Sequence, residues 1–161
     1  MKKFYLQILI VFSVSVLSSI IANGQSNLSS ITFLKSAKKY IGQDKSYIIT
    51  AIGSHYSELD LDEGIGMLYS PGFSNSYSPK SVAFISQYND VICQSVAIYY
   101  SYNQLNKILS YMNKNFKSIY PPSGAQVSFY KAWAESYRGN LYIWKLTKTD
   151  NLFFLTLRQL Q

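Results

Sequence analysis

The longest apolar stretch of the chain lies at its N-terminus, where residues 4–21 carry no charge. Lys2 and Lys3 precede this run, and Ala22-Asn23-Gly24 follows it with small residues where signal peptidase cleaves. This order is typical of a cleavable secretory signal peptide. The alternative is an uncleaved membrane anchor, but a glutamine and four serines dilute the run. We therefore predict that residues 1–24 are removed and that the protein is exported to the periplasm or the extracellular space.

Apolar residues recur at helical spacing in two short segments after the signal peptide. Residues 30–41 place Ile, Leu and Ala side chains on one helical face, and Gly42 follows as a stop signal. Asp44 is a suitable N-cap for a second segment, in which residues 47–52 are mostly apolar and Gly53 ends the run. We predict two short helices separated by a glycine.

A third helix has the clearest signal. Ser101 and Gln104 form an S-x-x-Q capping box, and the apolar residues between 105 and 116 return every three or four positions. The Pro-Pro-Ser-Gly sequence at 121–124 then predicts a break in the chain.

The remaining apolar runs are short and rich in β-branched and aromatic residues, which is typical of strands. Polar stretches at 54–64 and 70–80 are interpreted as loops, and Asn89-Asp90 suits the turn of a hairpin. The predicted strands cover residues 66–69, 81–88, 91–100, 127–137, 141–148 and 152–160.

Because short turns join neighbouring strands, the strands must pair antiparallel. The fold class is therefore α+β, with an antiparallel sheet of five to six strands and two or three helices packed on one face. Residues 25–161 are predicted to form a single α+β domain, which is an ordinary size for one core. The order of elements over roughly residues 30–100 loosely resembles modules of secreted β-lactamase-inhibitor proteins and small envelope-assembly lipoproteins.

The charge and residue composition limit which classes of binding partner we expect. After residue 24 the chain has thirteen basic and eight acidic residues, a net charge of about +5. These basic residues do not alternate with aromatic residues in a long run, so we predict no nucleic-acid partner. Cys93 is the only cysteine, so stability must come from packing and not from a disulfide within the chain.

One acidic stretch carries the candidate metal ligands His55, Glu58, Asp60, Asp62 and Glu63. Alternating acids are typical of calcium loops, and a histidine beside a carboxylate suits a general base. The calcium register fails, however, because a loop starting at Glu58 places Glu63 where the sharp-turn glycine belongs. A solvated acidic loop is the simpler interpretation.

No catalytic motif supports an enzyme. Cys93 lies in an apolar segment, where a cysteine usually packs as a small buried residue, and His55 is the single histidine available to activate it. The chain has no G-x-S-x-G elbow, H-E-x-x-H helix, phosphate-binding glycine loop or C-x-x-C pair. We predict no cofactor.

Tyrosine is the most distinctive residue type, with fourteen copies after residue 24. Exposed tyrosines on an uncovered sheet face offer a large contact area for a protein or glycan, although aromatic residues also favour strands for packing reasons. The candidate binding set is Tyr130, Trp133, Tyr137, Tyr142 and Trp144.

These observations favour a small exported binding or inhibitor-like domain that recognises a protein or a cell-envelope polymer. The alternatives are a small exported hydrolase-like enzyme that uses His55 with loop carboxylates, or a structural subunit of an envelope assembly. The protein is predicted not to be embedded in a membrane after cleavage, and the pattern has no signal for an oligomeric state.

Overall fold

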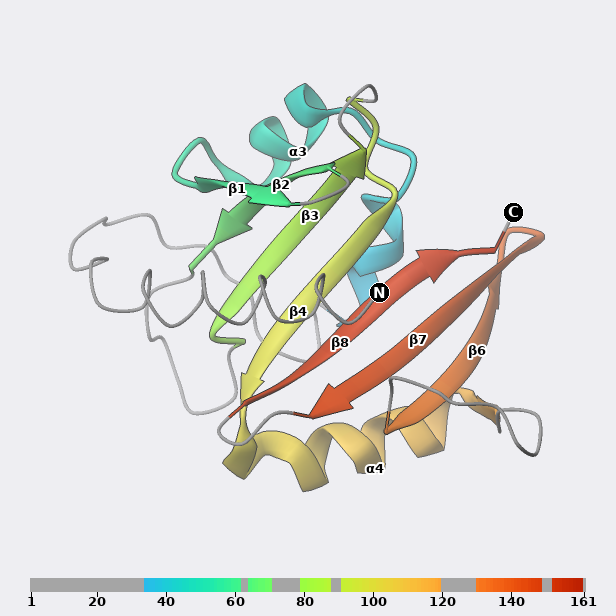
Figure 1. Ribbon diagram of the computed structural model, residues 1–161. Coiled ribbons are helices and arrows are strands. Elements are labelled where there is room, and N and C mark those ends of the chain that lie inside the picture. The colour runs from blue at the N-terminus through green and yellow to red at the C-terminus, as the bar shows by residue number, and fades with distance from the viewer. Residues whose placement is uncertain are drawn as a thin grey trace.

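The computed structural model contains one antiparallel sheet with helices on one of its faces (Figure 1). The predicted signal peptide lies outside the described residues, as do the predicted turn at Asn89-Asp90 and the break at 121–124. The structure describes residues 34–61, 64–70, 79–87, 91–119, 130–148 and 152–160.

Two of the three predicted helices form where the local sequence predicts them, whereas the first, residues 30–41, lies partly outside the described residues and contains the short 3-10 helix η1. Asp44 accepts a hydrogen bond from the backbone N–H of Tyr47 at 2.7 Å, and Gly53 ends the helix at a φ of 120°. The capping box is also present, since the Ser101 N–H donates to the Gln104 side chain at 2.9 Å. None of the helices in the described ranges has the length and apolar character needed to cross a membrane. The helical elements are η1 (Ala37–Lys39), α3 (Lys45–Ile52), η2 (Tyr102–Gln104) and α4 (Leu105–Asn115).

Across the described residues the sheet has eight strands, which corrects the predicted five to six. The two additional strands lie at its edges: β1 falls in the stretch interpreted as a polar loop, and β5 directly follows α4. The strands are β1 (Ser57–Leu61), β2 (Gly64–Tyr69), β3 (Ser81–Gln87), β4 (Ser95–Ser101), β5 (Lys117–Ile119), β6 (Lys131–Tyr137), β7 (Asn140–Lys148) and β8 (Leu152–Gln159).

Strand order is β1-β2-β3-β4-β8-β7-β6-β5, with every neighbouring pair antiparallel. The chain therefore contains two copies of one arrangement, a helix followed by a four-stranded meander. In the first copy α3 precedes β1 to β4, and in the second α4 precedes β5 to β8. The last strands of the two meanders, β4 and β8, pair at the centre of the sheet. Figure 1 shows α4 running across the lower end of the sheet from β4 toward β6, which makes this arrangement possible.

The predicted hairpin of β3 and β4 is confirmed, but β4 begins at Ser95 instead of residue 91. The preceding residues pair with a different partner. The Gly42 N–H donates to the Cys93 carbonyl and the Cys93 N–H donates to the Gln43 carbonyl, each at 2.8 Å. These bonds attach the start of β4 to the segment before α3 and align the helix layer with the sheet.

Alternate side chains along the strands enter two different clusters. The larger core joins the helices to one sheet face, where Ile48 of α3 and Ile108 of α4 are almost fully buried. The opposite face, called the groove face below, has a smaller cluster that contains strand residues only. Its buried members are Leu59, Leu61, Leu68, Ala83, Ala97, Tyr99 and Phe154.

Candidate binding groove

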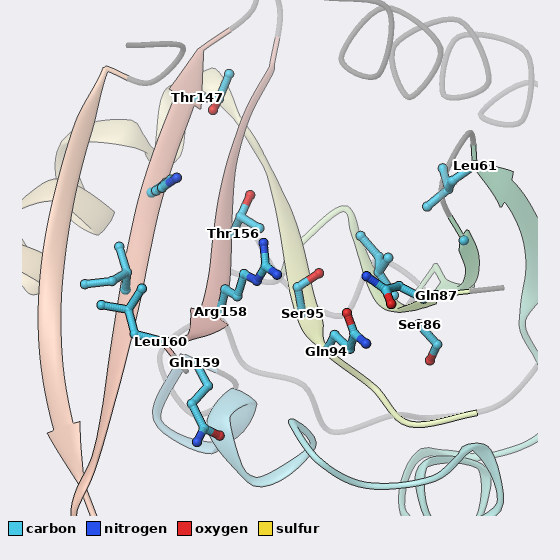
Figure 2. Close-up of a pocket in the computed structure, with 14 residues that line it drawn as sticks. Leu61, Ser86, Gln87, Gln94, Ser95, Thr147, Thr156, Arg158, Gln159 and Leu160 are labelled. Carbon is cyan, nitrogen blue, oxygen red and sulfur yellow. The ribbon is translucent and has the colours of Figure 1, made fainter. Parts of the chain in front are cut away.

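A hollow of about 450 Å³ lies on the groove face beside this smaller cluster. Its walls come from both meanders and meet over the central β4 and β8 strands (Figure 2). The described lining residues are Leu61, Gly64, Ile85, Ser86, Gln87, Gln94, Ser95, Ile143, Lys145, Thr147, Thr156, Arg158, Gln159 and Leu160.

Strand register brings the central polar residues together. Arg158 of β8 lies directly opposite Ser95 of β4 and Ile143 of β7, and Thr156 lies opposite Lys145. Because side chains alternate along a strand, the side chains of Thr156 and Arg158 leave β8 on the same face. Figure 2 shows the Arg158 side chain pointing from β8 toward β4, with Ser95 beside it.

The groove is basic and rich in hydrogen-bonding groups. Lys145 and Arg158 are diagonal neighbours on adjacent strands, a placement that separates Cβ atoms by roughly 7–8 Å. None of the described lining residues is acidic. Neutral amides and hydroxyls surround the two cations, so an anion with several oxygen atoms would find both charge and hydrogen-bond partners. These neutral polar residues are Ser86, Gln87, Gln94, Ser95, Thr147, Thr156 and Gln159.

Apolar side chains form a smaller part of the lining. Ile85 and Ile143 come from β3 and β7, on the two sides of the central strand pair, and Leu160 is 50% exposed just beyond β8. The Leu160 N–H donates to the Leu141 carbonyl at 2.8 Å, which holds the end of the chain at the groove. This combination suits a ligand with both polar and apolar surface.

The predicted aromatic set is divided between core and surface. Trp133 and Trp144 are fully buried in the helix-covered core and Tyr142 is 5% exposed, so these three offer almost no area to a ligand. Tyr130 is 58% exposed, and the Lys148 ammonium lies 3.6 Å from the centre of its ring. Tyr137 is partly buried at the edge of the core.

The candidate metal residues do not form a described site. His55 is exposed in the loop between α3 and β1, and Glu58 forms an exposed ion pair with Lys45 at 2.7 Å. Asp60 is exposed on β1, while Asp62 and Glu63 lie outside the described residues. Within the described ranges, no group of three or more His, Cys, Asp or Glu side chains is placed to hold a metal ion.

Cys93 is 1% exposed, and burial raises the pKa of its thiol to about 12. A thiol reacts through its thiolate, so we expect Cys93 to be unreactive in the folded protein at pH 8 and to react fully in denaturant. Alkylation followed by intact-mass measurement checks this. Fast single-site labelling of the folded protein would contradict the burial of Cys93 and reopen a nucleophilic role.

The sequence pattern alone does not single out the groove residues. The available signal was the placement of Thr156 and Arg158 at alternate positions of an otherwise apolar C-terminal strand. That pattern marks a polar patch on one face, but it does not identify β4 as the partner strand.

The described lining of the groove combines two cations with hydroxyl and amide groups and contains no His, Asp or Glu. Charge and shape are the properties of the groove from which a function can be inferred. Comparison with protein-family models, curated proteins and solved structures found no match for this chain.

Proposed function

We propose that this protein is a small exported binding domain that recognises an anionic segment of a cell-envelope polymer through the groove. The observation that carries the proposal is the basic lining, in which Lys145 and Arg158 lie among neutral donors without an acidic residue in the described set. Export rests on the signal-peptide pattern of residues 1–24.

The two cations have complementary roles in this proposal. The planar guanidinium of Arg158 matches a carboxylate or phosphate through two parallel hydrogen bonds, whereas the ammonium of Lys145 acts as a compact point charge. A ligand that binds the folded protein and not the unfolded chain also stabilises the fold.

A polymer fits the lining better than a large protein interface does. Energetically dominant residues in protein interfaces are enriched in Trp, Tyr and Arg, and the described groove lining contains an arginine but no aromatic residue. Amide and hydroxyl side chains instead suit a ligand with many polar oxygens. An acidic protein partner is the competing outcome that the experiment must distinguish.

The test expresses the full chain in an exporting host and confirms by intact mass that the product begins at Gln25. The product is then titrated calorimetrically with a carboxylated polysaccharide, an uncharged polysaccharide of similar length and an acidic peptide. We expect saturable binding of the carboxylated polymer only. Arg158→Gln should weaken this binding roughly tenfold, because it removes a charge-assisted pair, and Lys145→Gln should weaken it less.

Lys114→Gln is the matched control, since it removes the same charge from an exposed position on α4. If Lys114→Gln weakens binding as much as Arg158→Gln, attraction depends on net charge alone and the groove has no specific role. Preferential binding of the acidic peptide would identify a protein partner instead.

A further inference from the structure

A second basic pocket of about 450 Å³ lies away from the groove, between the N-terminal helical segment and the β6–β7 turn. Lys38, Lys39 and Tyr47 come from the helical side, whereas Tyr137 and Arg138 come from the end of β6 and the turn. It shares no described lining residue with the groove. Its volume falls within the range of small-molecule sites.

Besides the lysine of the Lys38–Glu135 ion pair, the pocket lining contains two more cationic side chains. Lys38 pairs with Glu135, and both side chains are largely buried, at 14% and 10% exposure. This leaves Lys39, which is exposed, and Arg138 as further cations in a lining whose described residues include no acid. A ligand with two negative charges matches these two groups.

The backbone at Arg138 gives independent support. The β6–β7 connection is a two-residue turn in which Arg138 has a φ of 51° and Gly139 a φ of 80°. Asn or Asp followed by Gly adopts this turn at lower cost than Arg does. A strained conformation that brings an arginine to a pocket suggests a functional reason for the arginine.

Neutral donors and ring faces complete the pocket. The Lys38 ammonium lies 4.5 Å and the Arg138 guanidinium 5.2 Å from the centre of the Tyr137 ring. Asn140 and Tyr47 also line the pocket, and Tyr47 is 47% exposed. An oxyanion would receive hydrogen bonds here, and an attached flat or sugar-like body could contact the tyrosine rings.

We propose that this pocket binds a phosphate monoester of a small molecule, with Arg138 and Lys39 holding the phosphate. A phosphate monoester carries a charge of about −1.5 to −2 near pH 7, which matches the two cations that Glu135 does not neutralise. The site is separate from the polymer-binding groove and does not depend on the function proposed for it.

The test titrates the full protein with glucose 6-phosphate, using glucose and glucuronate as comparators, and follows binding by calorimetry. We expect saturable one-to-one binding of the phosphate ester and weaker binding of glucuronate. Arg138→Asn should reduce affinity for the ester about tenfold, while the melting temperature stays unchanged or rises because Asn suits the turn. Lys39→Gln should also reduce affinity.

Lys114→Gln and the groove variant Arg158→Gln serve as controls and should bind the ester as the wild type does. Equal affinity of Arg138→Asn and wild type would overturn the proposal, as would equal binding of glucose and its phosphate ester. Glucuronate binding as tightly as the ester would reject the phosphate assignment, and no saturation at millimolar ester would reject the site.

Discussion

Replacing Glu135 with leucine should lower the free energy of unfolding by about 1–3 kcal/mol, because it leaves the part-buried Lys38 without its partner. The carboxylate also accepts a hydrogen bond from the Trp144 indole N–H at 3.1 Å, so the substitution affects a fully buried tryptophan as well. Urea denaturation followed by tryptophan fluorescence measures the change.

The double variant Lys38→Met with Glu135→Leu provides the control. It removes both charges and keeps apolar volume, so most of the lost stability should return, although the Trp144 N–H still lacks its acceptor. A double variant as unstable as Glu135→Leu alone would show that the charge of Lys38 is not the cause. A stable Glu135→Leu variant would contradict the buried pair.

Trp133→Ala should also lower the free energy of unfolding by about 3–5 kcal/mol, since it removes a fully buried aromatic side chain from the core. Trp133 lies opposite Trp144 in the β6–β7 pair, and its indole N–H donates to Asn113 of α4 at 3.1 Å. The variant therefore opens a cavity and weakens the contact between helix and sheet. Chemical denaturation is the direct measurement.

Tyr130→Ala is the comparison variant, because Tyr130 belongs to the same predicted aromatic set but is 58% exposed. Its stability should remain within about 0.5 kcal/mol of the wild type, as for most surface substitutions. If Trp133→Ala retained full stability but lost polymer binding, Trp133 would belong to a binding surface and the core placement would be contradicted.

The helices were predictable because their signals are local. The Asp44 N-cap, the glycine after each of the first two helical segments and the capping box at Ser101 all act within a few residues. The structure confirms these features and extends them by placing Leu34 and Ala37 in the core.

The edge strand β1 was not predicted because its alternating acidic and apolar residues fit both a solvated loop and a strand with one buried face. Glu58-Leu59-Asp60-Leu61 alternates acids with leucines, and the acids indicated a solvated loop. The leucines carry the structural information, since Leu59 and Leu61 are buried on the groove face while the acids remain exposed. The short strand β5 has too few residues to produce a periodic signal.

The groove could not be located from sequence because it depends on long-range pairing. Ser95 and Arg158 come from different meanders and become neighbours only when β4 pairs with β8. The sequence pattern places the aromatic residues in strands, but it does not show which of the two sheet faces each ring lies on. Trp133 and Trp144 face the helices, and a shift of one residue in register would have exposed them.

The most direct test of the groove is to map backbone amide shifts by NMR while adding the carboxylated polysaccharide to the full protein. We expect saturable shifts concentrated at Ser95, Thr156 and Arg158, and the Arg158→Gln variant should need about tenfold more polysaccharide to reach the same shifts at Ser95 and Thr156. Shifts spread over all basic surfaces, or confined to the region of Lys39 and Arg138, would contradict recognition by the groove.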